Sequence, residues 1–263
     1  SLYPNTILGQ DIAGSIDSIK KITAKHLKNN FDYFYRLENC HLVLIGNFDI
    51  EQIYRFVKET RSEFTISHKT VEKEKQPIEE NIQKLDSLQM DISISKLAIG
   101  FKNVHFSDNY MRESILVQLL FNLLFGWTSP YYKNWYAEGK IDESMSIEYE
   151  VSSRYSFVIM TMDTAEPIRM SSLIRQVMTS ADKKRLLTEE ALDLQKKALY
   201  GEFLRSLDNI QNLGSQYLAY SDDGKTYFDF GQELMSITSK DLKDFFNHYL
   251  SNLVITDFVV FPK

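Results

Sequence analysis

Two histidines at the right spacing would form the core of a zinc site. Metallopeptidases hold zinc with two histidines one helical turn apart, or with the inverted H-x-x-E-H motif, together with a third ligand. The five histidines of the chain are His26, His41, His68, His105 and His248. No two of them have either spacing, so the sequence predicts no metal ligand among its 263 residues.

Nucleophilic catalysis has no better support in the sequence. The chain contains neither a G-x-S-x-G motif nor a glycine-rich phosphate loop. Its one cysteine, Cys40, precedes an expected strand, and we interpret it as a small buried apolar residue. The carboxylates of Asp142, Glu143, Glu148 and Glu150 surround the start of another expected strand and are interpreted as a solvent-facing edge. The sequence therefore predicts no catalytic residue.

One aromatic stretch, residues 124–144, stands out from ordinary core sequence. Both tryptophans and three tyrosines crowd a short helix that begins at Ser129 and Pro130 and ends before Gly139. Such side chains either pack a domain together or form a surface that contacts a partner or a peptide. The sequence leaves both interpretations open.

A repeated segment indicates how these residues are positioned. Residues 22–35 and 237–250 align without a gap at an offset of 215 and share six identities in fourteen positions. Each copy places a threonine, Thr23 or Thr238, before a helical run and leads into an apolar strand, at residues 42–45 or 258–261. Two unrelated threonine-capped helices are the alternative to a duplicated domain.

The two copies differ in what precedes them. About 145 residues of patterned chain, from 90 to 236, lie before the second copy, whereas only twenty-one residues lie before the first. We therefore expect residues 1–66 to be the end of a truncated first domain and residues 89–263 to be a complete second domain. Residues 67–88, rich in Lys, Glu, Gln and Asn, are the expected linker.

The periodicity of the second domain predicts an α+β fold, with an antiparallel sheet covered by helices on one face. The expected order begins with one strand with a bulge near Ser95 and Lys96, a helix capped by Asp108 or Asn109, and the short helix from Pro130. A strand pair over 145–162, three further helices, and the repeat helix with a final strand follow. The first domain should contribute a helix to about residue 35, a buried strand at 41–45 and a helix after Asp49.

Composition excludes several classes of function. The net charge is −6 and charges of both signs are interspersed, which argues against a nucleic-acid partner. No apolar run reaches the roughly 18 residues that span a bilayer, so we expect no membrane partner and a cytoplasmic protein. The abrupt start at Ser1 suggests a fragment of a longer chain.

Several stretches together resemble the pitrilysin-type zinc peptidases, relatives of the mitochondrial processing peptidase, and most closely their processing-protease subgroup in Gram-positive bacteria. The stretches are Tyr3 with Pro4, residues 11–19, 22–23 and 44–49, and then residues 124–129, 138–142 with Ser144, and 201–206. They cover most of the chain and keep their order. The resemblance implies a duplicated pitrilysin-type α+β domain with its first copy truncated.

The resemblance also indicates what lies outside this sequence. The family's inverted zinc motif and its distal glutamate would precede Tyr3, so zinc is expected in the full-length enzyme and none in this fragment. An Arg and a Tyr seven residues apart help to hold the peptide in the family. Trp135 and Asp142 stand at the aligned positions and are the expected substrate-binding residues.

The chain would accordingly be the C-terminal, non-catalytic portion of a zinc-dependent peptidase that encloses a peptide. Its implied partners are the missing N-terminal domain half, a sister peptidase subunit, and a peptide or unfolded protein substrate. An inactive subunit of a heterodimeric peptidase and a protein-binding module that uses residues 127–136 are the alternatives.

Overall fold

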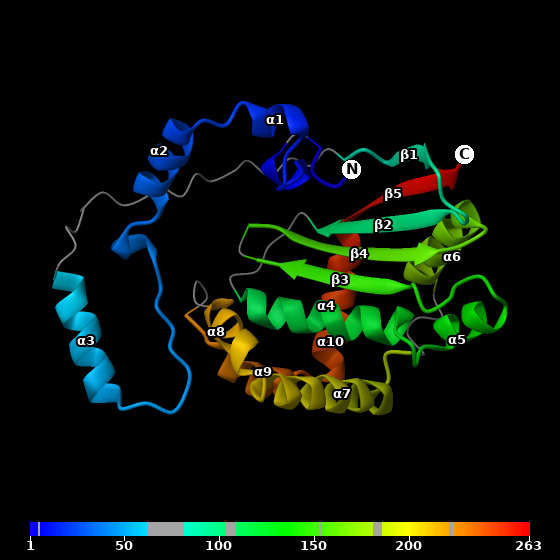
Figure 1. The fold of residues 1–263 in the computed structure, drawn as a ribbon. Coiled ribbons are helices and arrows are strands. Elements are labelled where there is room, and N and C mark those ends of the chain that lie inside the picture. The colour runs from blue at the N-terminus through cyan, green and yellow to red at the C-terminus, as the bar shows by residue number, and fades with distance from the viewer. Residues whose placement is uncertain (5, 63–81, 104–108, 153, 181–185, 221–223) are drawn as a thin grey trace.

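The computed structural model describes residues 1–4, 6–62, 82–103, 109–152, 154–180, 186–220 and 224–263. Most of these residues form one layered unit, a sheet packed against helices. The first few residues lie on the sheet, and residues 10–62 lead away from it (Figure 1). Within the described ranges, no helix combines the length and the apolar character needed to cross a membrane.

The sheet has five strands in the order β1-β5-β2-β4-β3. The strands are β1 (Leu85–Met90), β2 (Lys96–Asn103), β3 (Ser146–Val151), β4 (Ser156–Asp163) and β5 (Leu253–Pro262). All neighbours are antiparallel except β1 and β5, which are parallel. The last strand of the chain thus lies between the first two.

The prediction of a single bulged strand near Ser95 is wrong. Its two halves are separate strands, because β5 lies between β1 and β2 and pairs with both. Periodicity along one segment cannot reveal this insertion, since the pairing partner is about 160 residues away. β1 also begins at Leu85, inside the range expected for the linker.

Seven helices belong to the layered unit: α4 (Tyr110–Phe125), α5 (Pro130–Ala137), α6 (Pro167–Thr179), α7 (Glu189–Leu207), α8 (Ile210–Leu218), α9 (Phe230–Ser236) and α10 (Ser239–Ser251). The expected caps are present, since Asn109, Ser129, Thr188 and Thr238 each accept a backbone N–H of the first helical turn. Short 3₁₀ helices occur at Ile7–Gly9, Leu37–Asn39 and Tyr227–Asp229.

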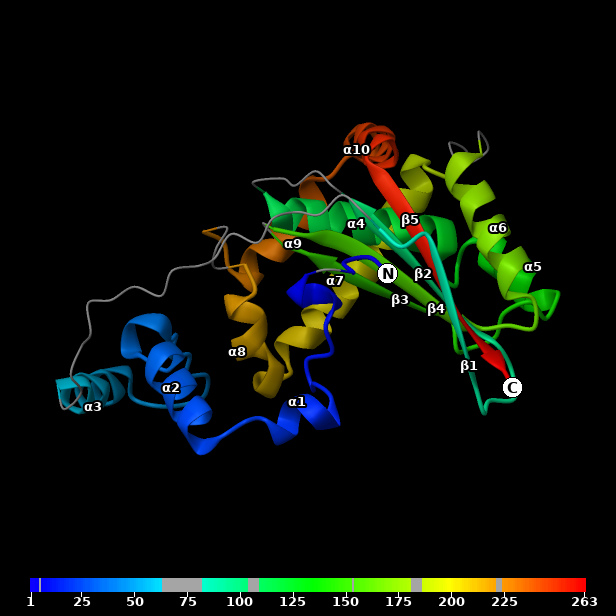
Figure 2. The same cartoon turned by 90° about the horizontal axis from the view of Figure 1, so that it is seen from above.

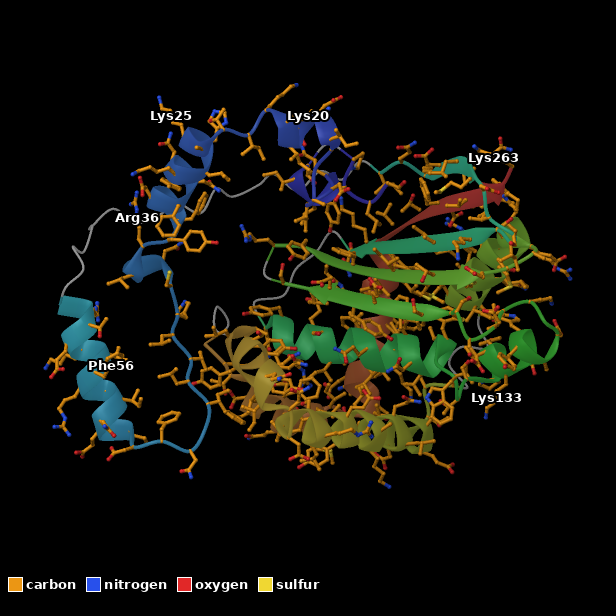
Figure 3. The ribbon with its side chains drawn as sticks, in the orientation of Figure 1. Lys20, Lys25, Arg36, Phe56, Lys133 and Lys263 are labelled. Carbon is orange, nitrogen blue, oxygen red and sulfur yellow. The ribbon has the colours of Figure 1, made fainter. Side chains whose placement is uncertain are left out.

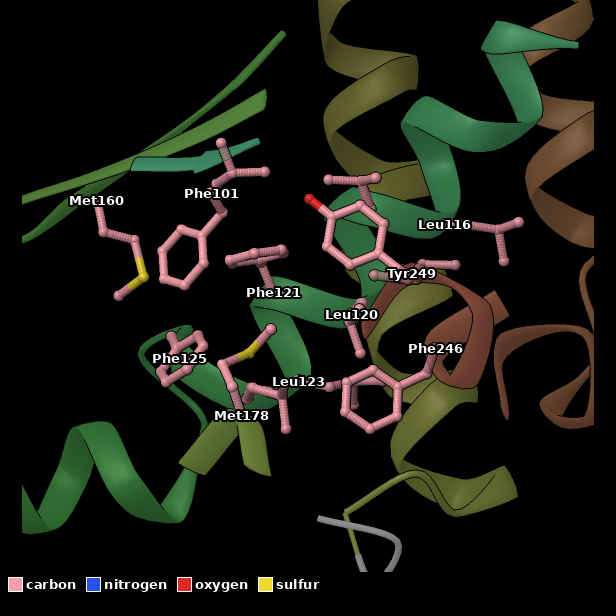
Figure 4. Packing of buried hydrophobic residues seen from close by; sticks show 14 of the residues in the cluster. Phe101, Leu116, Leu120, Phe121, Leu123, Phe125, Met160, Met178, Phe246 and Tyr249 are labelled. Atoms are coloured by element: carbon pink, nitrogen blue, oxygen red, sulfur yellow. The ribbon is translucent and has the colours of Figure 1, made fainter. Parts of the chain in front are cut away.

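The core lies between one face of the sheet and helix α4, which is buried along most of its length. Alternate strand residues such as Phe101 and Met160 point toward it, as the period of two predicts (Figure 4). Phe121 of α4 meets the ring of Phe101 edge-on at 5.0 Å between centroids. Each such large apolar side chain contributes roughly 1.5–3 kcal/mol by its burial. The α+β class with helices over one face is confirmed.

Helices α1 (Ile16–Lys20), α2 (Ala24–Phe34) and α3 (Ile50–Ser62) lie outside this unit, as Figures 1 and 2 show. The one helix expected up to residue 35 is in fact two, separated where Thr23 caps α2. No described side chain from residue 10 to residue 61 is buried. Phe56 of α3, labelled in Figure 3, is exposed although it belongs to an apolar stripe.

The expected buried strand at residues 41–45 does not form, and Leu42 and Leu44 are exposed. A strand needs a neighbour for its backbone hydrogen bonds, and in the described chain none of the five strands pairs with this segment. Instead, Val43 and Ile45 approach Gly214 of α8. Cys40, expected to be buried, is exposed for the same reason.

Candidate functional site

Trp135, one of the two expected substrate-binding residues, lies inside the domain. Ser129 caps α5, and Pro130 occupies its first turn. This start directs Trp135 onto α4, where its ring stacks on Phe125 at 6.3 Å between centroids and contacts Tyr131 at 6.0 Å. Only 5% of Trp135 is exposed. Its side chain therefore holds α5 against the core.

Asp142, the other expected residue, lies on the surface in the turn between α5 and β3. The backbone N–H of Ser144 donates to Asp142 Oδ1 at 2.9 Å. Hydrogen bonds from the Ser144 side chain and backbone hold the pKa of the Asp142 carboxyl below its usual value. The carboxylate is thus ionised, fixed in orientation and accessible to a ligand.

The backbone between these two residues forms a tight turn. Gly139 has φ +67°, a conformation that side chains other than glycine rarely adopt. The N–H of Lys140 then donates to the carbonyl of Trp135 at 2.9 Å. The turn places Trp135 and Asp142 in different surroundings, one buried and one exposed, and the structure does not bring the two side chains together.

The other aromatic residues of the stretch divide between the two interpretations. Trp127 is 77% exposed and Tyr136 is also exposed, so both are available at the surface. Tyr131 and Tyr132 are partly buried against the core. The stretch therefore both packs the domain and presents aromatic surface.

The acidic residues of β3 lie at the edge of the sheet, as expected. Among the strands of the described chain, β3 pairs only with β4. Glu148 and Glu150 alternate along it with the inward-facing Ile147 and Tyr149. Exposed charges on an edge strand discourage pairing with another chain. The interpretation as a solvent-facing edge is confirmed.

A cavity of about 320 Å³ lies beside β3, between α4 and α7. The hydroxyl of Tyr149 donates to Asn122 Oδ1 at 2.8 Å, and Gln195 Nε2 donates to Thr128 Oγ1 at 2.8 Å. Burial raises the pKa of Tyr149, and the nearby Glu202 adds to this effect. Sequence reasoning missed these residues, although polar Asn122 within the apolar α4 was a visible signal.

Three of the five histidines, His26, His41 and His248, are exposed, while His68 and His105 lie outside the described residues. Across the described ranges, no three His, Cys, Asp or Glu side chains are grouped closely enough to hold a metal ion. The residues that the structure describes therefore do not fit the zinc site that a metallopeptidase needs.

Comparison with known families decides the identity. Residues 21–199 match the family of peptidase M16 inactive domains, which is more than half of the chain. The chain belongs to the peptidase M16 family. The resemblance to pitrilysin-type peptidases is confirmed, and the part represented is the inactive, C-terminal domain.

Relatives of this M16 chain include a protein named uncharacterized zinc protease YmfH, of Bacillus subtilis (strain 168), with 26% identity over 268 residues. That alignment covers all of the present chain and 62% of YmfH. Among solved structures, an M16-like peptidase from Alicyclobacillus acidocaldarius has a TM-score of 0.81 and 22% identity, covering 97% of this chain and 62% of that one.

Two further structures agree with the M16 fold. A protease from Helicobacter pylori has a TM-score of 0.73 and 14% identity, covering 95% of this chain and 61% of its own. The peptidase M16 inactive domain from Pseudomonas fluorescens has a TM-score of 0.73 and 16% identity, with coverage of 97% and 61%. The M16 chain thus spans less than two thirds of the length of the relatives it matches.

Proposed function

We propose that this chain is the C-terminal, non-catalytic portion of a zinc-dependent peptidase and forms half of a chamber around an unfolded peptide. The match to the M16 inactive domain carries this proposal. The name of YmfH as a zinc protease supports zinc chemistry in the longer protein. The described residues lack a metal-binding group, so the proposal assigns zinc binding and catalysis to residues upstream of Ser1.

The apolar face of α2 supports a missing N-terminal half as the partner. Three residues of α2 correspond by the 215-residue offset to residues of α10: Leu27 to Leu242, Phe31 to Phe246, and Phe34 to Tyr249. Their exposures are 62%, 58% and 44% in α2, against 1%, 2% and 0% in α10. The same helix face is bare in one copy and fully buried in the other.

The second copy shows what would cover this face. Helix α10 packs against α4, and Tyr249 meets Phe121 edge-on at 6.2 Å between ring centroids. An equivalent helix and sheet, supplied by upstream residues, would bury Leu27, Phe31 and Phe34. The segment at residues 41–45 would then gain the neighbouring strands it lacks here and take the place that β5 has in the second domain.

Within the proposed chamber, Asp142 and Trp135 have different roles. The exposed carboxylate of Asp142 accepts a hydrogen bond or pairs with a positive charge on the substrate. Trp135 acts through packing, since its ring fixes the turn that carries Asp142. We further propose a cytoplasmic location, which fits a chain whose lone cysteine has no partner for an intrachain disulfide.

The test compares this chain with a longer form that includes its upstream coding region. The longer form should bind one zinc ion per chain and cleave an unfolded protein such as reduced, alkylated lactalbumin, and the 263-residue chain should do neither. Alanine variants of the upstream zinc-motif histidines serve as controls. One zinc per chain in the 263-residue form would overturn the proposal. A longer form without H-x-x-E-H would instead favour the inactive subunit of a heterodimer, active only with its sister chain.

A further inference from the structure

The face of the sheet opposite the helices carries a furrow along β2. Ala98 and Gly100 are neighbours on this face, two residues apart on the strand. Beside them stand larger side chains, Phe258 of β5 next to Ala98 and Ile159 of β4 next to Gly100. On their other sides these two residues have threonines as neighbours, Thr161 beside Ala98 and Thr256 beside Gly100. Small residues flanked by larger ones leave a channel in the surface of the sheet.

The first three residues of the chain, called here the N-terminal strap, fill one end of the furrow. Leu2 occupies the space above Gly100, where an added Cβ would come within 2.7 Å of Leu2 Cγ. The fully buried Lys102 donates to the carbonyl of Leu2 at 3.2 Å. The carbonyl of Ser1 accepts the N–H of Gln83 at 3.0 Å. The furrow thus already binds a leucine side chain together with its backbone.

A cavity of about 310 Å³ lies beside the strap, on the same face of the sheet. Its wall is formed by the strap and the residues that follow it, Ser1, Leu2, Tyr3, Leu8 and Gly9, and by the sheet residues Ala98, Gly100, Phe157, Ile159, Thr256 and Phe258. Tyr3 also lines this cavity and is 6% exposed. Its buried hydroxyl has no hydrogen-bond partner in the described part of the chain. The cavity is therefore lined mainly by apolar side chains and is large enough for a leucine or phenylalanine side chain.

We propose that this cavity is a subsite for an apolar side chain of an extended peptide bound in the chamber. The inference rests on the proposed function, because a chamber half must present a peptide-binding wall. Leu2 shows which occupant the furrow accepts, and the cavity continues the same furrow. The apolar wall would bind the side chain of the peptide.

Two capped peptides of similar size test the subsite in the 263-residue chain. The probe is acetyl-Gly-Gly-Leu-Leu-Gly-Gly-amide, and the control replaces both leucines by asparagine. Binding is followed by amide chemical shifts in ¹⁵N-labelled protein. The leucine peptide should shift the signals of Ala98, Gly100 and Ile159 saturably, and the asparagine peptide should bind at least ten-fold more weakly. Equal affinity of the two peptides, or shifts confined to other elements, would contradict the subsite.

Variants sharpen the test. Ala98→Phe fills the cavity and should weaken leucine-peptide binding at least ten-fold, with an unchanged circular dichroism spectrum. Leu194→Phe, an exposed position on α7, is the matched control and should bind like the parent. If Ala98→Phe does not fold, Ala98→Val should give a smaller loss in the same direction. Unchanged binding by a folded Ala98 variant would overturn the subsite.

Failure of the subsite and failure of the proposed function are distinguishable. A longer form that binds zinc and cleaves protein, while the leucine peptide fails to bind at Ala98, contradicts the subsite alone. The opposite result is that this chain binds the leucine peptide selectively, while the longer form neither binds zinc nor cleaves protein, alone or with a sister chain. That result contradicts the proposed peptidase and supports the subsite.

Discussion

Lys102 Nζ lies 4.0 Å from the centroid of the Tyr3 ring, at a position where the lysine is fully buried. The same ring meets Phe157 edge-on at 5.7 Å. These contacts join the N-terminal strap to the open face of the sheet. Tyr3 is the one residue before α3 that the described structure buries, so it anchors the first residues of the chain to the sheet.

Replacement of Tyr3 should release this anchor. Tyr3→Leu keeps an apolar side chain but removes the aromatic face, and a desolvated cation–π contact contributes up to about 2 kcal/mol. We expect a loss of that size in the free energy of unfolding, measured in urea, and faster proteolysis between residues 4 and 9. Tyr33→Leu is the matched control, because its contact with Arg36, at 5.2 Å, is exposed. An equal effect of both changes would show that Tyr3 is not a specific anchor.

The same change should affect the stability of the 263-residue chain by different amounts in the two repeat helices. Phe246→Ala removes a buried ring from α10 and should cost about 3–5 kcal/mol of stability. Phe31→Ala, its counterpart in α2, should change the stability of the 263-residue chain by less than about 0.5 kcal/mol. In the longer form, Phe31→Ala should become as costly as Phe246→Ala. Urea unfolding of both forms measures this, and a Phe31 effect that stays small in the longer form argues against the missing domain half.

Substitutions of Trp135 and Asp142 should affect different properties, the stability of the fold and the binding of substrate respectively. Trp135→Ala should lower the free energy of unfolding by about 3–5 kcal/mol, because it removes the buried ring that stacks on Phe125. Asp142→Asn should leave stability within about 0.5 kcal/mol but raise the KM of the longer form for its substrate. Trp127→Ala, at an exposed position, is the control for the tryptophan. An unchanged KM in Asp142→Asn would remove Asp142 from the binding site.

The cap of α10 should give a defined dependence on acid. Asp241 and Thr238 form a reciprocal capping box, and Arg112 lies 3.2 Å from Asp241. Hydrogen bonds from Thr238 lower the pKa of Asp241, so its carboxylate stabilises the fold above its unfolded-state pKa, and this contribution is lost as pH falls through the lowered folded-state pKa.

Asp241→Asn should therefore be less stable than the parent at pH 7. The difference should begin to shrink as pH falls below about 4, the usual pKa of an aspartate, and should close only below the lowered folded-state pKa of Asp241. Urea unfolding over a series of pH values measures the difference, and a gap that does not shrink at all below about pH 4 would show that the charge of Asp241 is not its source. At the matching position α2 has His26, and only the Thr23 cap is formed there.

Local signals in the sequence predicted much of the second domain. The threonine caps of α2 and α10, the Pro130 start of α5 and the alternation in β4 all depend on residues within a few positions of one another. Interactions between distant segments could not be predicted in this way. The insertion of β5 between β1 and β2 depends on partners far apart in the chain.

The candidate sites show the same division. Alignment selected Trp135 and Asp142 by position, but only packing distinguishes the buried ring from the exposed carboxylate. The contact of Leu2 with Gly100 in the furrow could not be predicted, because the two residues are 98 positions apart in the chain. Cys40 was misjudged because burial of its segment depends on strands that the described chain does not supply.

The central place of β5 also has a consequence during synthesis. Its hydrogen bonds join β1 to the rest of the sheet, so the sheet stays in two pieces until Pro262 has emerged from the ribosome. Until β5 pairs with β2, the nascent chain must keep the unpaired edge of β2 from aggregating. Loss of the last ten residues, even without any change to the helices, would leave the domain unable to complete its folding.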